Sequence, residues 1–173
     1  MQCKEDAILM AMNPYREIFE ELNNAKIQYL VVGGVAVNLH GYSRFTGDVD
    51  ILLALTIENL DRMAALMERL GYNPRLPVDV QTLAEEEQVR RWMEEKGMTA
   101  YSYIHPKMPQ FSIDILTGDS FKFFDFDARK ILLELQDLSV PVIAIDDLLE
   151  MKKQANRQKD IEDIAALLEL KGL

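Results

Sequence analysis

The sequence predicts a single α+β domain: a mixed β-sheet flanked by helices, with a helical C-terminal tail. Strand-like apolar segments alternate with helical patterns along the 173 residues, a length that suits one domain with its own core. Some neighbouring strand candidates are joined too closely for a helical crossover, so part of the sheet must be antiparallel. Two helical patterns end the chain. We therefore treat residues 1–173 as one domain.

The first half of the chain has recognisable helix starts and stops. Proline suits the first turn of a helix, threonine caps a helix N-terminus, and glycine ends one. The expected elements are a helix from Asn13-Pro14 through about Ala25, a strand over 27–32, a short helix over 35–40, a strand over 49–53, and a helix from the Thr56 cap to Leu70 with Gly71 as its stop.

The second half mixes charged helices with short strands. Its expected elements are a loop over 71–79, a charged helix over 81–96, strands over 100–104 and 111–116 joined by a turn at 105–109, short strands over 131–135 and 140–145, a helix capped by Asp146 or Asp147 and running toward Ala155, and a last helix over 159–170. Residues 120–126 fit either helix or strand.

The composition excludes several classes of protein. At 49% hydrophobic and 28% charged residues, with no apolar run near the ~20 residues of a membrane span, the chain reads as soluble. The N-terminal apolar patch is too short for a secretory signal, and the single cysteine, Cys3, excludes an internal disulfide, so we expect a cytoplasmic protein. Two histidines and one cysteine argue against a zinc site.

The formal net charge of -10 bears on the partners. Proteins that hold nucleic acid through its phosphates are usually basic, so the charge argues against a free-standing nucleic-acid binder. It fits a carboxylate-rich metal site, or docking against a basic partner.

Residues 29–53, YLVVGGVAVNLHGYSRFTGDVDILL, hold the most informative pattern. A strand leads into Gly33-Gly34, and a short helix follows. Glycine lets the backbone approach a phosphate, and free N–H groups at a helix start favour anions. By itself, a Gly-Gly pair after a strand is more often a tight turn.

Asp48 and Asp50 lie two residues apart at the start of the next strand. Strand geometry puts both carboxylates on one face, where they repel each other unless a cation lies between them. Mg²⁺ suits such a pair because it takes one or two carboxylates plus substrate phosphate oxygens. The alternative is a pair of solvated aspartates at a strand edge.

Asp114, in FSIDILTG, is a third strand-borne carboxylate. It would meet the first two aspartates if the two strands are neighbours. Three carboxylates can hold two Mg²⁺ ions, one lowering the pKa of an acceptor hydroxyl and the other carrying a triphosphate. The alternative is a solvent-facing residue in a half-exposed strand.

The combination of Gly33-Gly34, Asp48-x-Asp50 and Asp114 resembles the polymerase-β-like nucleotidyltransferase superfamily. The run GGVAVNLHGYSRFTGDVDI is similar to small bacterial nucleotidyltransferases that include the AbiEii-type toxins of toxin–antitoxin and phage-defence systems. The resemblance continues in RRWMEEKGM, YSYIHP and LLEMKKQANRQKDIEDIAAL, and so covers most of the chain.

This resemblance implies a nucleotidyltransferase fold and a role for each motif residue. Gly33 and Gly34 would hold the triphosphate of a nucleotide such as ATP. Asp48 and Asp50 would be metal ligands, and Asp114 would be the third carboxylate, which helps to activate the acceptor. Many members of the superfamily carry Gly-Ser at the turn, and the missing serine hydroxyl removes one phosphate or metal contact here.

Arg44 and Thr46 match the family pattern just before the aspartates and are further nucleotide-binding candidates. Three roles are open for Arg44: pairing with phosphate, standing as a surface cation, or holding its loop through a carboxylate. His40 is expected to pack or to cap its helix rather than to transfer protons.

Positive charge gathers near the C-terminus in an otherwise acidic chain. Lys152 and Lys159 are the preferred candidates there for neutralising a triphosphate, within the family's Lys…Arg-x-Lys-Asp-x-x-Asp pattern. The alternative is structural: cations at the end of one helix, followed by a new helix with Asp160 and Asp163 in its first turn.

The sequence thus predicts a Mg²⁺-dependent transfer of a nucleoside monophosphate from an NTP to a hydroxyl of an RNA end, a protein or a small molecule. The resemblance adds a cognate antitoxin or toxin as a possible partner. The alternative is a catalytically degenerate module that binds nucleotide or a partner without turnover. No base-reading motif selects the NTP.

Overall fold

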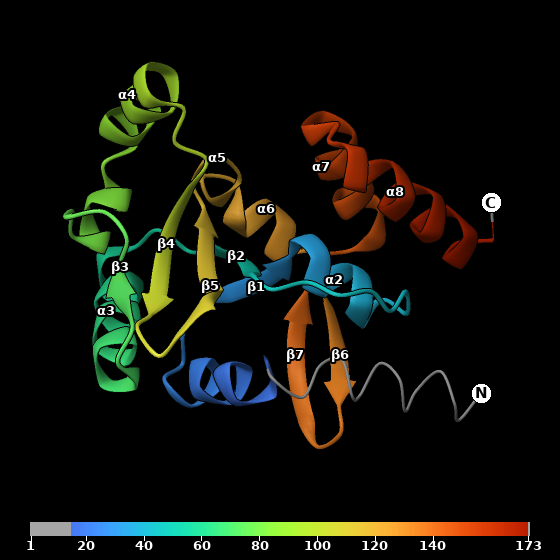
Figure 1. Cartoon of the computed structure of the whole chain (residues 1–173), viewed down its shortest axis with the longest axis horizontal. Helices are drawn as coiled ribbons and strands as arrows, with labels where there is room; N and C mark the ends of the chain where they lie inside the picture. Colours follow the sequence, from blue (N-terminus) through green and yellow to red (C-terminus); the bar gives the residue numbers. More distant parts are fainter. Residues whose placement is uncertain (1–14, 173) are drawn as a thin grey trace.

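The computed structural model describes residues 15–172 and is built around a mixed seven-stranded sheet (Figure 1). The strand order is β3-β4-β5-β2-β1-β7-β6. The strands are β1 (Tyr29–Val32), β2 (Val49–Leu53), β3 (Asn73–Pro74), β4 (Ala100–His105), β5 (Met108–Leu116), β6 (Ile131–Leu135) and β7 (Leu138–Val142). Cys3 and the helix start predicted at Asn13-Pro14 lie outside the described residues.

The pairing confirms the predicted mixed sheet. β2 is antiparallel to β1 and parallel to β5, while β1 is also parallel to β7. The remaining pairs, β3 with β4, β4 with β5, and β6 with β7, are antiparallel. All four residues of β1 are buried, as expected for a central strand covered on both faces. β1 and β2 therefore lie at the centre of the sheet.

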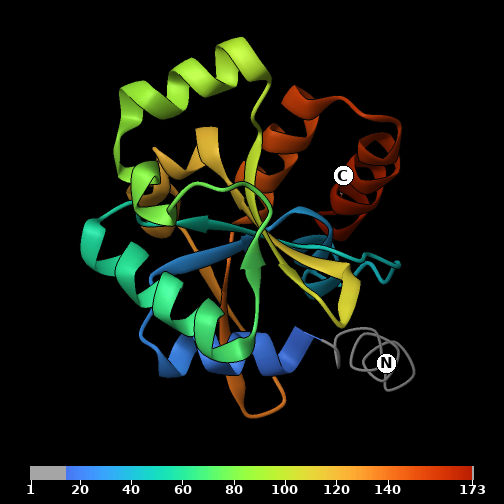
Figure 2. The same ribbon diagram turned by 60° about the vertical axis from the view of Figure 1, so that its left-hand side comes forward.

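The helices gather on opposite sides of this sheet. They comprise helical residues 15–24, α2 (Gly33–Leu39), α3 (Ile57–Leu70), α4 (Glu86–Lys96), α5 (Thr117–Ser120), α6 (Phe123–Asp127), α7 (Ile145–Ala155) and α8 (Gln158–Leu170). In Figures 1 and 2, α4 and the pair α7–α8 project from one side, whereas residues 15–24 lie at the other. None of the helices described is long and apolar enough to cross a membrane.

The predicted ends of α3 are confirmed. The Thr56 hydroxyl accepts a hydrogen bond from the Asn59 amide at 3.3 Å, and Gly71 ends the helix with φ +80°. The left-handed backbone there is why glycine stands at this position.

The single helix predicted over 81–96 is wrong. The segment divides at Glu85 into a 3₁₀ turn, Val80–Ala84, and α4. Val80 and Leu83 are both buried, whereas α4 buries only Val89. In a 3₁₀ turn, side chains three residues apart lie on the same side, so Val80 and Leu83 can both be buried there. The solvated α4 begins only after this turn.

Smaller differences concern turns and caps. Asp146 and Asp147 lie in the first turn of α7, and Ala144 is the N-cap, so neither aspartate caps the helix. The predicted loop over 71–79 contains the short edge strand β3, and the turn at 105–109 is shorter because β5 begins at Met108. Residues 120–126 contain no strand: Ser120 ends α5, residues 121–122 form a turn, and α6 begins at Phe123.

Candidate functional site

The three predicted carboxylates come from two neighbouring strands. Asp50 in β2 and Asp114 in β5 are directly paired across the parallel ladder. Asp48 lies just before β2, and the hydroxyl oxygen of buried Ser112 is 2.9 Å from Asp48 Oδ1 and 3.0 Å from Asp114 Oδ1. The fold thus brings Asp48, Asp50 and Asp114 together.

Ser112 is a site residue that the sequence reasoning missed. It lies two residues before Asp114 in β5, so both side chains point to the same face of the sheet. The two-residue spacing of Ser112 and Asp114 was the signal in the sequence that could have identified Ser112 as a neighbour of the carboxylates. The single hydroxyl proton can be donated to only one carboxylate at a time, so Ser112 bridges the two without neutralising either.

The three carboxylates are electrostatically unbalanced. Burial, followed by the charges of Asp114 and Asp48, raises the pKa of Asp50 to about 6, while Lys159 and Arg157 act in the opposite direction. A carboxyl group that holds its proton this strongly lacks a close counter-charge.

Gly33 lies directly against Asp50. Its φ is +64°, and a Cβ added there would lie 2.0 Å from Asp50 Oδ2. Both the left-handed backbone and the close approach require glycine, so the predicted turn serves to admit the Asp50 carboxylate.

Gly34 is crowded by the loop that precedes β2. A Cβ at this position would lie 2.8 Å from Arg44 Nη2 and 2.9 Å from Thr46 Oγ1. The space into which a serine side chain would project is therefore taken by a guanidinium and a hydroxyl. This explains why Gly-Gly stands here in place of Gly-Ser.

Arg44 holds its loop through a carboxylate, the third of its predicted roles. Its Nε and Nη2 donate to Asp163 Oδ1 and Oδ2 of α8 at 2.6 and 2.8 Å. The buried Asn38 side chain brackets the Arg44 backbone, donating to its carbonyl at 2.8 Å and accepting from its amide at 3.0 Å. The loop before β2 is thereby fixed to both α2 and α8.

Lys152 is buried rather than free. Its side chain is 4% exposed, and Nζ lies 2.6 Å from Asp163 Oδ2 and 3.2 Å from Asp160 Oδ1. Arg157 Nε donates to Asp160 Oδ2 at 2.9 Å. We call Arg44, Lys152, Arg157, Asp160 and Asp163 the tail network. Its three cations exceed its two carboxylates by one positive charge.

The tail network lowers the pKa of both its carboxyls. Burial would raise the pKa of Asp163, but hydrogen bonds from Arg44 and Lys152 outweigh it and lower the pKa below its usual value. Burial would also raise the pKa of Asp160, but hydrogen bonds from Arg157 and Lys152 outweigh it and lower the pKa below its usual value. The family pattern around 152–163 thus encodes a buried ion-pair cluster, which matches much of the structural alternative.

The exposed cations of the tail face Asp50. Arg157 lines a cavity of about 120 Å³ together with Gly33 and Asp50, and Asp119 and Lys152 also line it. Lys159 is exposed, and its charge lowers the pKa of Asp50. Arg157 and Asp119 are further residues that the predicted site did not include.

His40 packs, as predicted. Its Nε2 donates to the Ile143 carbonyl at 2.7 Å, and burial lowers the pKa of the imidazole.

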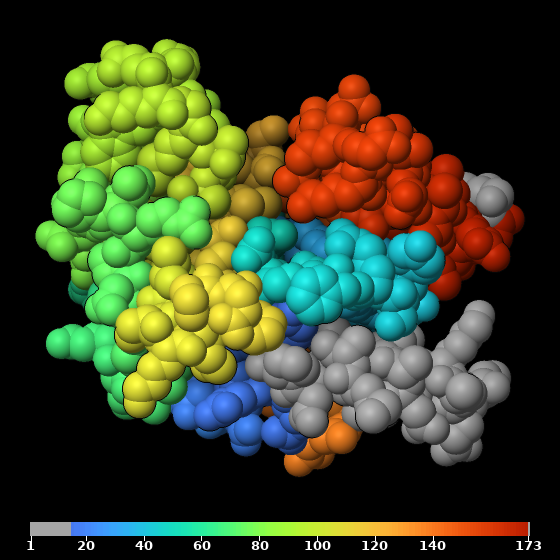
Figure 3. All heavy atoms as spheres, viewed as in Figure 1, coloured from blue at the N-terminus to red at the C-terminus, as the bar shows by residue number. Residues whose placement is uncertain are grey.

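Figure 3 shows the loop before β2, in cyan, exposed beneath the red α7–α8 pair and beside the yellow β4–β5 hairpin. α4 and α7–α8 stand apart above it.

The carboxylates present an oxygen-only donor set, which suits Mg²⁺. Within residues 15–172, no three histidine, cysteine, aspartate or glutamate side chains converge closely enough to hold a metal ion. Asp48 and Asp114 face the Ser112 hydroxyl instead. Since Mg²⁺ often takes only one or two carboxylates and fills its shell with water and phosphate, Asp48 and Asp50 remain candidate ligands.

The solved structures that resemble this one include the following two. The lincomycin-bound lincosamide antibiotic adenylyltransferase LnuA superposes with a TM-score of 0.55 at 16% identity, covering 89% of this chain and 94% of its own. An antigenic nucleotidyltransferase-like protein from Paracoccidioides brasiliensis gives a TM-score of 0.57 at 18% identity, covering 95% of this chain and 77% of its own. At these identities the likeness shows a shared nucleotidyltransferase fold.

Sequence comparison agrees with the fold. No curated protein sequence matches the chain at a significant level. A family model described as "Nucleotidyl transferase AbiEii toxin, Type IV TA system" matches residues 19–173. That match covers most of the chain, including the glycine turn, the three aspartates and the tail network. The chain therefore belongs to the AbiEii family of nucleotidyltransferases.

Proposed function

We propose that the protein transfers a nucleoside monophosphate from an NTP to a hydroxyl acceptor, with Asp48, Asp50 and Asp114 at the reaction centre. One observation carries the proposal: Asp50 and Asp114 are paired across β2 and β5, and Ser112 joins Asp114 to Asp48. Among the described residues no cation forms a salt bridge with any of the three, and neighbouring carboxylates left unpaired are costly unless function requires them.

The nucleotide is proposed to lie between the glycine turn and the start of α8. Gly33 and Gly34 would allow the triphosphate to approach the backbone, and the Thr46 hydroxyl lies 2.9 Å from the point that a Cβ on Gly34 would occupy. Lys159 and Arg157, both exposed and electrostatically coupled to Asp50, would neutralise the phosphates. A bound Mg²⁺ would supply charge neutralisation at the phosphates.

Arg44 and Lys152 are proposed to position the site rather than to contact phosphate. Both are paired with buried Asp163, and a buried cation already satisfied by a carboxylate is not free for a ligand. Through Asp160, Lys152 also holds Arg157, which lines the cavity beside Asp50.

The chemical step is an in-line displacement. Asp114 accepts the proton of the acceptor hydroxyl, and the acceptor oxygen forms a bond to the α-phosphorus. The bond from the α-phosphorus to the bridging oxygen breaks, and pyrophosphate leaves with the electron pair. Holding the hydroxyl and the α-phosphate in line provides much of the rate enhancement.

The family description places its members in toxin–antitoxin systems, and we propose a toxin role for this chain. Expression alone would then slow growth, and Asp48→Ala would relieve the effect. Normal growth with the wild-type protein present at the same level would argue against this role.

The enzymatic test follows label from each α-³²P-NTP, with Mg²⁺, into the RNA, protein and small-molecule fractions of a bacterial extract. Replacing Asp48 and Asp50 by alanine should lower transfer by about a thousandfold or more, since charge stabilisation at the phosphate is lost. Chelation of divalent ions should have the same effect.

The matched control is Asp61→Ala, which removes an exposed aspartate of α3 outside the site. It should leave transfer unchanged. NTP binding without transfer, in every fraction, would instead favour the binding-only module.

A further inference from the structure

A cavity of about 570 Å³ lies beside Asp114 on the side of the molecule that carries α4. Segment 75–78, the end of α4 and strand β4 line it, and Asp114 contributes to the lining. Pockets for drug-sized ligands span roughly 300–1,000 Å³, so the cavity is large enough for a small molecule.

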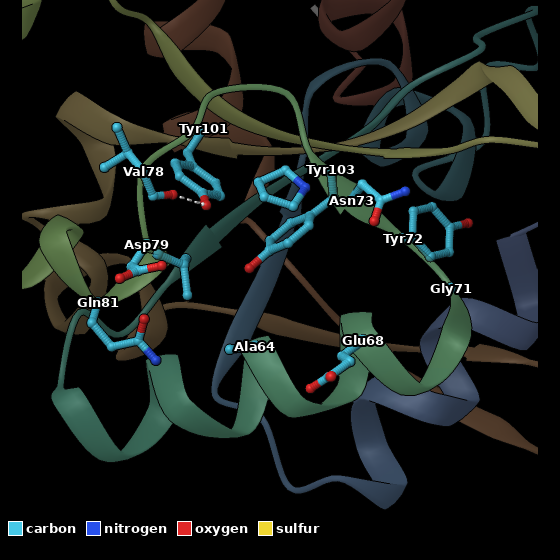
Figure 4. Close-up of a pocket in the computed structure, with 12 residues that line it drawn as sticks. Ala64, Glu68, Gly71, Tyr72, Asn73, Val78, Asp79, Gln81, Tyr101 and Tyr103 are labelled. Carbon is cyan, nitrogen blue, oxygen red and sulfur yellow. Dashed lines mark hydrogen bonds between the residues drawn. The ribbon is translucent and has the colours of Figure 1, made fainter.

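The alternation of side chains along β4 separates this cavity from a smaller one. Ser102, opposite Asp114 in the β4–β5 ladder, lines the cavity beside Asp114. Tyr101 and Tyr103 instead line a cavity of about 260 Å³ next to α3 (Figure 4). Because successive side chains of a strand point to opposite faces, the two cavities lie on opposite sides of β4.

Segment 75–78, which forms one wall, is anchored at both ends. The Arg75 amide donates to the Ser102 carbonyl at 2.9 Å, and the Tyr101 hydroxyl donates to the Val78 carbonyl at 2.6 Å (Figure 4). Burial raises the pKa of Tyr101 to about 12, so its hydroxyl remains a donor at neutral pH. The wall is therefore built into the fold.

The lining combines an apolar body with two cations. Trp92 supplies an aromatic surface, and Leu76, Pro77, Val78 and Met98 add apolar area. Arg75 and Lys96 also line the cavity, are exposed, and have no carboxylate within salt-bridge distance among residues 15–172. Two unpaired cations around an apolar cavity suit a ligand with an apolar body and an anionic group.

The surroundings disfavour a long polyanion. α4, which borders the cavity, exposes Glu86, Glu87, Glu94 and Glu95, and the whole chain carries a net charge of -10. Along α4 these four carboxylates outnumber the exposed cations Arg90, Arg91 and Lys96, so an RNA strand leaving the cavity would find no continuous basic track for its phosphates. A compact molecule that stays within the cavity needs no such track.

We propose that this cavity is the acceptor site and that its ligand is a small hydroxylated molecule with an aromatic or apolar body and an anionic group. The proposal rests on the transferase function proposed above. The hydroxyl lies beside Asp114, the body contacts Trp92, and Arg75 and Lys96 bind the anionic group. Asp114 would then be shared between the nucleotide and the acceptor.

The first arm of the test measures binding without turnover. The probe is anilinonaphthalene sulfonate, an aromatic anion. Because Trp92 is the single tryptophan of the chain, probe fluorescence excited through tryptophan reports probe bound near Trp92. The double variant Arg75→Glu/Lys96→Glu should weaken binding about tenfold or more, because attraction becomes repulsion. Arg91→Glu, an exposed cation of α4 outside the lining, should change it less than about twofold. Equal affinity in the double variant and the wild type would overturn the proposal.

The second arm follows label from α-³²P-NTP. Label in the low-molecular-mass fraction, reduced about tenfold or more by the same double variant and not by Arg91→Glu, is the supporting result. Label only in RNA or only in protein would overturn the acceptor assignment while leaving the transferase function standing. No label in any fraction would overturn both.

Discussion

The three strand-borne aspartates, Asp48, Asp50 and Asp114, and the tail network place the same residue type in opposite environments. Around Asp50, carboxylates face one another, and burial together with like charge raises its pKa to about 6. In the tail network, Asp160 and Asp163 are completely buried, yet cations lower the pKa of both. The comparison teaches that burial alone does not distinguish a functional carboxylate from a structural one. The presence or absence of a paired cation does. Unbalanced charge indicates a place for a ligand, and balanced charge indicates architecture.

Removing a carboxylate from the balanced cluster should have the largest effect on folding. In Asp163→Ala, Arg44 and Lys152 both lose a buried partner. We expect the free energy of unfolding to fall by about 3–5 kcal/mol, since Arg44 would lose both bonds to a carboxylate and Lys152 would keep only Asp160, which leaves buried positive charge poorly compensated. Urea denaturation measures it. A loss below about 1 kcal/mol would show that the cluster contributes little to the fold.

The contact between the two regions can be tested with Gly34→Ala. The added methyl group would press on Arg44 and Thr46, so we expect a loss of about 1–3 kcal/mol in the free energy of unfolding. In an Arg44→Ala background, part of that loss should disappear. Additive losses in this double-mutant cycle would contradict the proposed contact.

The unbalanced cluster should respond to pH with the opposite sign from a salt-bridged carboxylate. The pKa of Asp50 is raised in the folded state, so the folded protein binds its proton more tightly than the unfolded chain does. This group's contribution to stability is therefore greatest below pH 4 and is lost as pH rises to about 6.

Asp50→Asn removes that ionisation. Without divalent ions, the variant should be more stable than the wild type at pH 8 by on the order of 2 kcal/mol, with the advantage vanishing toward pH 4. Urea denaturation at both pH values measures the difference. An equal difference at pH 4 and pH 8 would show that Asp50 ionises normally.

The smallest effect is expected at an exposed ion pair. Glu86→Gln breaks the contact of Glu86 with Arg90 on α4, where both side chains are more than half exposed. The free energy of unfolding should change by less than about 0.5 kcal/mol, since solvent screens such pairs. This variant is also the matched control for Asp163→Ala. A comparable loss in the two would remove the contrast between buried and exposed pairs.

The central fold was predictable because β1 is a continuous apolar run and β2 is apolar apart from Asp50, so neither needs a distant partner to be recognised. The approach of Asp114 to Asp50 was also inferred, conditional on β2 and β5 being neighbours. Arg44 and Asp163 were not predictable as a pair, because 119 residues separate them and the residue type of an arginine does not show whether it is buried or exposed. The break at Glu85 was missed because the charged pattern of 86–96 continues into a segment that buries two side chains, Val80 and Leu83, whereas α4 buries only Val89.

Nor could the sequence separate Lys152 from Lys159. Both lie in one charged run, yet one is buried between two aspartates and the other is exposed. α7 ends at Asn156, whose φ is +47°, so Lys152 lies in α7 and Lys159 in α8. Local composition does not record which of the two is buried.

The crowding at Gly34 also has an evolutionary consequence. A lineage that exchanged this glycine for serine in one step would place a side chain against Arg44, so the change would be disfavoured until the arginine or its loop had moved first. The order of the two steps is thereby constrained. Among descendants of this chain, the second glycine and the arginine ten residues later should be inherited as a unit.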